Sequence, residues 1–120
     1  MIIGIGVDSI SISRVAKAME REHFIKRIFT ETELSQMDPK RRRAASDFAG
    51  KEAVVKAFGT GFNGIEANEI AILRNEAGAP YIELSGKAKM RADQMGIVQW
   101  HISITNTEDI ATAFVIGSGL

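Results

Sequence analysis

A short alternating run at residues 2–8 restricts the fold of this chain more than any other part of the sequence. Strict alternation is typical of a β-strand, because successive side chains point to opposite faces. The two faces are Ile3, Ile5 and Val7 on one side and Gly4, Gly6 and Asp8 on the other. We expect the apolar face to enter the core. We expect the glycine face to let another backbone or a ligand approach closely.

A long helix is the second constraint. Asp38 can cap its start, Pro39 suits its first turn, and apolar residues recur at helical spacing up to Phe58. Gly59 is a natural stop, and a glycine-rich loop follows at 59–64. Because alanine and phenylalanine dominate this helix, we expect it to be largely buried in the centre of the fold.

Shorter elements surround these two. A serine-capped helix is predicted over 12–22, with Val15 and Met19 on its inner face, and a capping box at 30–33 opens a short helix. The later elements follow in this order: strands at 69–74 and 80–84, a helix over 86–95 capped by Ser85 and closed by Gly96, and a hairpin of strands at 98–105 and 110–117. Residues 1–120 therefore predict a single compact α+β domain with an antiparallel sheet and a long central helix.

Composition excludes several kinds of site. The chain has no cysteine, so disulfides, thiolate metal sites and cysteine nucleophiles are impossible, and a reducing compartment such as the cytoplasm fits. With only two histidines, a zinc site built from histidines is not expected. No apolar run approaches the ~18 residues of a membrane span, and the start predicts a strand rather than a secretory leader. We therefore expect no membrane partner.

Charge is distributed unevenly although the net charge is zero. Residues 1–58 carry eleven Lys and Arg against eight Asp and Glu, whereas residues 59–120 carry four against seven. A basic first half favours an acidic partner or a phosphate-bearing ligand, and a solvated charged surface is the alternative. We expect no nucleic-acid partner.

Candidate chemistry lies near the end of the long helix. Glu52 and Lys56 are four residues apart and share a helix face, which alone is typical of a surface ion pair. The apolar helix and the loop after it favour a second interpretation, in which a carboxylate, an ammonium and loop amides hold a metal–phosphate group. Asp8 is the second candidate carboxylate, with a helix cap or turn as its alternative role. Mg²⁺ would suit this pair, because it uses only one or two protein carboxylates.

Several motifs together resemble one family. They are Gly4-Ile5-Gly6-Val7-Asp8 with Arg14; Arg27-Ile28-Phe29-Thr30 with Glu33; Phe48-Ala49-Gly50-Lys51-Glu52-Ala53 followed by Lys56-Ala57-Phe58-Gly59-Thr60-Gly61; Gly78-Ala79-Pro80; and His101-Ile102-Ser103-Ile104-Thr105. In this order and spacing they closely resemble holo-acyl-carrier-protein synthases, the small bacterial 4′-phosphopantetheinyl transferases. The resemblance spans residues 1 to about 117. Its core, an early aspartate combined with the lysine–glutamate helix and its Gly-Thr-Gly end, is highly specific.

The resemblance implies a metal and phosphate site. Asp8 and Glu52 would hold magnesium, which also binds the pyrophosphate of coenzyme A, and together with Lys56 they would be the catalytic residues. The groups that would contact phosphates are Lys56, Gly59, Thr60 and Gly61. The carrier serine would attack the β-phosphate that bears pantetheine, and adenosine 3′,5′-bisphosphate would leave. Glu52 and a metal-bound water both remain candidates for the base that accepts the serine proton.

The resemblance also implies a nucleotide pocket on the later strand. Ser103 and Thr105 would help to form this pocket for coenzyme A. Asn106 follows them where family members often have histidine. An asparagine can still donate or accept a hydrogen bond, so we expect a polar contact to coenzyme A at this position.

The implied partners are coenzyme A and an acyl carrier protein in fatty acid biosynthesis. Arg14, with Lys17 and Arg21 on the same basic helix face, would dock the acidic recognition helix of the carrier. Small members of this family are typically homotrimers with active sites between subunits, so we expect a homotrimer. Two other functions stay open: a magnesium-dependent phosphohydrolase of coenzyme A, and a carrier-binding module without chemistry.

Overall fold

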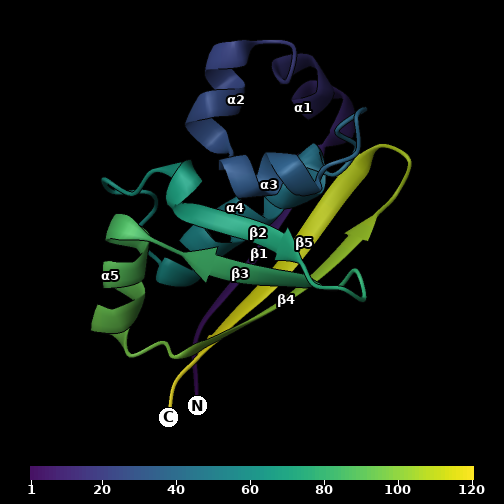
Figure 1. Ribbon diagram of the computed structural model, residues 1–120. Helices are drawn as coiled ribbons and strands as arrows, with labels where there is room; N and C mark the ends of the chain where they lie inside the picture. Colours follow the sequence, from purple (N-terminus) through teal and green to yellow (C-terminus); the bar gives the residue numbers. More distant parts are fainter.

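The computed structural model describes residues 1–120 as two antiparallel sheets arranged around one long helix (Figure 1). The strands are β1 (Ile2–Ser11), β2 (Ile70–Arg74), β3 (Pro80–Leu84), β4 (Gln99–Asn106) and β5 (Ile110–Ser118). The helices are α1 (Ile12–Ala18), α2 (Glu22–Ile28), α3 (Glu31–Gln36), α4 (Ala44–Phe58) and α5 (Gly86–Met95), with a 3₁₀ turn η1 (Ala67–Glu69). The predicted α+β class is confirmed. The sheet that we expected as one is divided into a three-stranded sheet, β1-β5-β4, and a two-stranded sheet, β2-β3.

The glycine face of β1 lies directly on α4. A Cβ atom at Gly6 would collide with the carbonyl oxygen of Ala53, and one at Gly4 would collide with that of Ala57. The close backbone approach predicted for this face is therefore confirmed. The prediction for the opposite face is wrong for two of its three residues: Ile5 is 55% exposed and Val7 is 51% exposed, whereas Ile3 packs against the core. Because only the glycine face can come this close to the helix, the Ile5 and Val7 side chains point away from the core.

Helix α4 is the centre of the core, with twelve of its fifteen residues buried. It ends as predicted at Gly59, whose φ of 78° is left-handed. Its start is five residues later than the Asp38-Pro39 signal indicated. The carboxylate of Asp38 instead accepts from the backbone and the side chain of Arg42, and Arg41 takes a φ of 54°, which a helix cannot continue through.

The helix predicted over 12–22 is shorter than expected, and a second helix that was not predicted follows it. The first helix ends at Ala18, and α2 begins at Glu22 after a short turn. The turn between α1 and α2 lets Ile25 and Ile28 pack in the same small core as Val15 of α1. A continuous helix would carry these later residues away from that core, so burial of apolar surface favours the turn.

The remaining elements follow the predicted order. Hairpins join β2 to β3 and β4 to β5, and α5 lies between them as expected. Ser85 occupies the capping position of α5 without a side-chain bond, because Glu69 Oε2 accepts the Lys87 N–H in its place. None of the helices combines the length and apolar character that a bilayer crossing would require.

Candidate active site

Asp8, Glu52 and Lys56 meet where β1 crosses α4. Asp8 continues the glycine face of β1, which packs on the helix, so its side chain points toward the same side of the sheet. The Lys56 ammonium donates to Asp8 Oδ1 at 2.9 Å. The hydrogen bond to this carboxylate raises the pKa of Lys56. The Asp8 side chain is only 17% exposed, whereas that of Lys56 is 55% exposed, so the pair lies at the rim of the fold.

Glu52 adds a second carboxylate to this corner. Its pKa is raised, first because the side chain is partly buried and second because the negative charge of Asp8 lies nearby. The Lys56 charge acts in the opposite direction but is the smaller influence. Two carboxylates therefore share one ammonium. The site has an excess of negative charge, which a bound cation would neutralise.

The donor set fits magnesium better than a transition metal. No group of three or more His, Asp or Glu side chains is arranged to hold a metal ion, so the protein offers two carboxylates. Mg²⁺ is commonly held by one or two carboxylates together with waters and substrate phosphates. A diphosphate would complete the oxygen ligands that Asp8 and Glu52 begin.

The loop after α4 exposes its backbone beside this corner. Gly59 and Gly61 have φ values of 78° and 67°, and no atom lies within 4 Å of where their Cβ atoms would be. Thr60, between them, is exposed. Backbone amides in such a loop can approach phosphate oxygens without obstruction from a side chain. The structure thus places the predicted phosphate loop next to Lys56, one residue beyond the end of the helix.

The residues predicted for the nucleotide pocket do not join this cluster within one chain. Ser103 and Thr105 point to the outer face of the three-stranded sheet, whereas Asp8 lies on the inner face with its partner Ala113. Asn106 is on the inner face near the start of α4, where its side-chain amide exchanges hydrogen bonds with Ser46 Oγ at 3.0 and 3.2 Å. Within one chain, Ser103 and Thr105 therefore lie on the opposite face of the sheet from Asp8.

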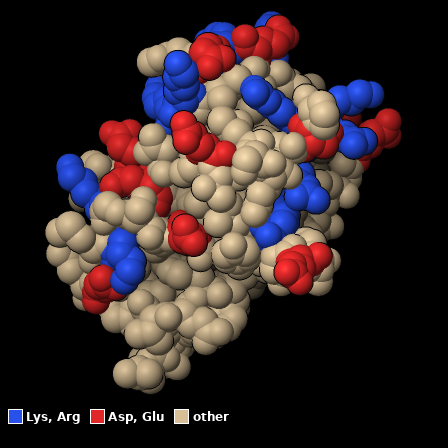
Figure 2. Space-filling view, in the orientation of Figure 1, with Lys and Arg blue, Asp and Glu red and all other residues tan.

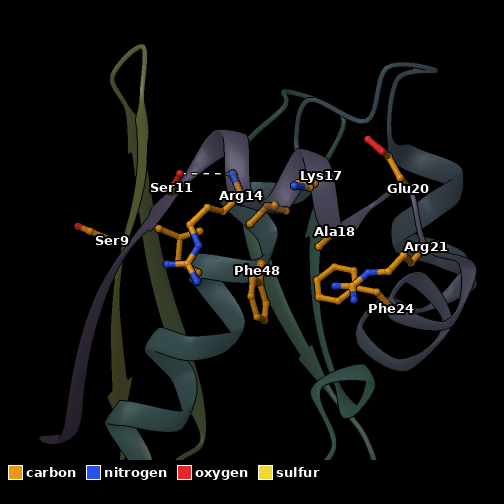
Figure 3. Close-up of a pocket in the computed structure, with 11 residues that line it drawn as sticks. Ser9, Ser11, Arg14, Lys17, Ala18, Glu20, Arg21, Phe24 and Phe48 are labelled. Atoms are coloured by element: carbon orange, nitrogen blue, oxygen red, sulfur yellow. Dashed lines mark hydrogen bonds between the residues drawn. The ribbon is translucent and has the colours of Figure 1, made fainter.

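Beside α1 lies a hollow of about 760 Å³ that contains the three predicted docking residues Arg14, Lys17 and Arg21. Figure 3 shows Arg14 and Arg21 extending into it beside two aromatic rings. These rings belong to Phe24 and Phe48, which meet edge to face with centroids 5.9 Å apart. The hollow therefore combines cationic groups with an apolar floor.

The charged residues are not spread evenly over the face seen in Figure 2. Basic and acidic side chains gather over the helical parts, while the end that carries both chain termini is nearly free of them (Figures 1 and 2). That end continues into the exposed apolar residues of β1, which include Ile2 and Ile5.

Sequence reasoning missed two features. The first is the aromatic floor of the hollow, because Phe24 lies in α2, beyond the helix predicted over 12–22, and Phe48 was assigned to the apolar stripe of the long helix. The second is a fully buried ion pair between Lys51 and Glu33, 2.7 Å apart. The capping box at Thr30 pointed to Glu33 as a helix residue, but no spacing rule connects residues 18 positions apart.

Comparison with known proteins identifies the family of this chain. Residues 4–115 match the family model of the 4′-phosphopantetheinyl transferase superfamily. A holo-[acyl-carrier-protein] synthase of Lachnoclostridium phytofermentans is 50% identical over 117 residues, covering 98% of this chain and 96% of that protein.

Solved structures give the same result. Acyl carrier protein synthase of Plasmodium yoelii with ADP bound superposes with a TM-score of 0.87 at 33% identity, covering 100% of this chain and 97% of that one. Holo-[acyl-carrier-protein] synthase of Helicobacter pylori in complex with coenzyme A superposes with a TM-score of 0.83 at 31% identity. The match covers 95% of this chain and 99% of that one. This chain belongs to the 4′-phosphopantetheinyl transferase superfamily.

Proposed function

We propose that the chain transfers 4′-phosphopantetheine from coenzyme A to a serine of an apo acyl carrier protein, with magnesium held by Asp8 and Glu52. The observation that carries this proposal is the meeting of two carboxylates, one ammonium and an open glycine loop in a member of this superfamily. Relatives bear the name of this activity, and one was solved with coenzyme A. We place the reaction in fatty acid biosynthesis, in the cytoplasm, which suits a chain without cysteine.

The residues have separate tasks in the transfer. The serine hydroxyl gives its proton to a base, for which Glu52 is the candidate that the chain itself supplies. The serine oxygen forms a bond to the β-phosphorus, the bond from that phosphorus to the bridging oxygen breaks, and adenosine 3′,5′-bisphosphate departs with that oxygen. Negative charge grows on the phosphoryl oxygens during this step, and positioning with charge neutralisation lowers the barrier. Lys56 supplies an ammonium at the rim, and the Gly59–Gly61 amides supply neutral donors. Bound magnesium would add Lewis-acid stabilisation of the diphosphate.

The hollow beside α1 is the proposed docking surface for the carrier protein. An acidic helix would meet the guanidinium groups of Arg14 and Arg21 while its apolar side chains cover Phe24 and Phe48. Such a surface, with cations around an apolar floor, gives both electrostatic steering and buried contact area. The apolar floor adds a contact that the charges alone would not provide.

We further propose that three copies assemble with the sites between them. Ile5, Val7 and Phe114 leave a strip of apolar surface on the outer face of the sheet, each more than 40% exposed. Ser103 and Thr105 share that outer face, so a neighbouring copy could receive them near its own phosphate site. Light scattering of the purified protein should give the mass of a trimer. A monomer that is fully active would contradict this assembly.

The transfer itself is tested by mass spectrometry of an apo carrier incubated with the protein, coenzyme A and magnesium. The mass of the carrier should rise by one phosphopantetheine unit, and chelation of magnesium should stop the increase. Coenzyme A incubated without carrier should remain intact. Release of free phosphopantetheine in that control would instead support a phosphohydrolase.

The docking surface is tested by Arg14→Glu. We expect the KM for the carrier to rise by about tenfold, because one rim charge is reversed, and the KM for coenzyme A to stay near that of the parent. Steady-state rates with each substrate varied in turn measure both values. Equal increases in the two KM values would show that α1 is not the docking surface.

A further inference from the structure

A second group of charges on α4 takes no part in the chemistry proposed above. Lys51 comes immediately before Glu52 in the helix, yet its side chain is completely enclosed. Its ammonium donates to Glu33 Oε1 at 2.7 Å, to the carbonyl oxygen of Ala67 at 3.1 Å and to that of Ile70. All three N–H donors of the lysine are therefore in use.

Glu33, the partner of Lys51, is enclosed to the same degree. Its Oε1 atom also accepts the backbone N–H of Thr30 at 3.0 Å, and its Oε2 atom accepts that of Ile72 at 3.1 Å. The ion pair therefore joins four segments of the chain: α3, α4, the η1 turn and β2. No polar atom of the pair lacks a partner.

A second buried ion pair lies one helical turn earlier. Asp47, four residues before Lys51, lies 2.9 Å from the guanidinium of Arg74 at the end of β2. The side-chain oxygen Oε1 of Gln36, from α3, accepts a hydrogen bond from the backbone N–H of Arg74 at 2.8 Å. The unit formed by α3 and β2 is thus attached to α4 by the hydrogen-bonded Lys51–Glu33 pair and by the ion contact of Asp47 with Arg74, and the four charges sum to zero.

Stability alone gives a weak reason for such a network. A buried ion pair adds little compared with apolar residues of the same volume, because both charges lose their hydration. What hydrogen-bonded charges supply is a fixed geometry. The other contacts of α4 are made largely by small residues such as Ala49, Ala53 and Val54. Small apolar side chains resist rotation or sliding of a helix less than directed hydrogen bonds do.

The geometry of a helix connects this network to the phosphate site. Successive residues differ by about 100° around the axis, so the direction in which Lys51 is held also sets the direction of Glu52. Lys56 lies on the same edge as Glu52, one turn further on. We propose that Lys51 and Glu33 are positioning residues, which fix the rotation of α4 so that Glu52 and Lys56 face Asp8. This inference rests on the phosphate-site assignment made above.

The test uses the charge-neutral double variant Glu33→Gln/Lys51→Met in the full-length protein. It removes both buried charges, so neither is left without a partner. We expect the parent circular dichroism spectrum, a kcat about 10- to 100-fold lower, and a higher magnesium concentration for half-maximal rate, because slight misplacement of reacting groups is costly. The KM for the carrier is not diagnostic here, because Phe48 of α4 also lines the α1 hollow and would move with the helix. Isothermal titration of coenzyme A with and without MgCl₂ provides a second readout.

Ala92→Gly in α5 is the matched control, since it destabilises a buried helix position away from the site. Below its melting temperature this control should keep the parent kcat and magnesium dependence. A folded double variant with parent kinetics would overturn the positioning role. If the double variant does not fold, the variant Asp47→Asn/Arg74→Met replaces it in the same assays. A several-fold fall in its kcat supports the proposal. Kinetics equal to those of the parent overturn the proposal.

One further variant separates this proposal from the function on which it depends. Parent activity in Glu52→Gln would overturn the phosphate site itself. An inactive Glu52→Gln together with parent kinetics in the folded double variant would overturn only the positioning role.

Discussion

Two charged clusters on the same helix differ in how completely they are paired. On one side of α4, Lys51 and Glu33 are wholly enclosed, and every donor and acceptor has a partner. On the other side, the ammonium of Lys56 bonds Asp8 alone, and Glu52 lies near both charges at a partly open rim. The first cluster is complete within the fold, whereas the second still has an excess of negative charge.

This difference shows where ligand chemistry can occur. A buried ion pair whose donors and acceptors all have partners has none left for a substrate. Its role is to hold the surrounding structure in place. A carboxylate pair with too little positive charge nearby gains when a cation arrives. The shift of the Glu52 pKa to higher values is the electrostatic sign of this incomplete pairing. The contrast predicts that charge-removing mutations will cost mainly activity on the open side and mainly stability on the buried side.

The largest expected effect is on the open side. Glu52→Gln should reduce transfer by about a thousandfold, equivalent to roughly 4 kcal/mol, because a neutral amide neutralises a cation less well. The thermal midpoint should stay close to that of the parent, since Glu52 makes no ion pair inside the fold. Transfer assays across a magnesium series measure the loss. Near-normal activity at millimolar magnesium would contradict the role of Glu52.

Lys51→Met should instead have its largest effect on stability. Removing the ammonium leaves the Glu33 charge buried without a partner, which should lower the free energy of unfolding by roughly 3–5 kcal/mol. Urea denaturation of the single variant and of Glu33→Gln/Lys51→Met measures the effect, and the double variant should recover much of the loss. A single variant as stable as the parent would contradict the stabilising role of the Lys51 ammonium beside Glu33.

A smaller effect concerns pH and the second buried pair. Burial raises the pKa of Asp47 from 3.8 to about 6, against the opposing influence of the Arg74 charge. The folded state therefore keeps a proton between pH 3.8 and 6 that the unfolded chain has released, so this group lowers stability as pH rises through that window. The change is roughly 3 kcal/mol for a shift of about two units, and it levels off above the folded pKa.

Asp47→Asn should remove that contribution. Urea unfolding of the parent and the variant at several pH values gives the difference between the two curves, in which the titration of other groups cancels. The Lys51 and Glu33 charges also face Asp47, so both proteins must keep that pair intact. Parallel curves across the whole range would show that Asp47 does not titrate there.

Much of the local structure could be predicted from the sequence because its signals are local. The capping box at Thr30, the stop at Gly59 and the alternation in the later strands each depend on neighbouring residues, and the structure confirms all three. Two boundaries were predicted wrongly, for different reasons. At the start of α4 a competing local contact decides, because Asp38 binds Arg42, four residues further on, as part of a turn and not as a helix cap. At the end of α1 packing decides, because the chain turns so that Ile25 and Ile28 join the core of Val15.

The sequence by itself determined the α+β class, the glycine face of β1 and, through a specific motif, the identity of Asp8, Glu52 and Lys56 as candidate site residues. Only the tertiary structure decided that the apolar face of β1 is exposed and that Lys51 pairs with Glu33 across 18 positions. The physical reason is the range of the interactions. Hydrogen-bonded caps and strand alternation are local properties of the chain, whereas packing and burial of charge depend on which distant segments meet.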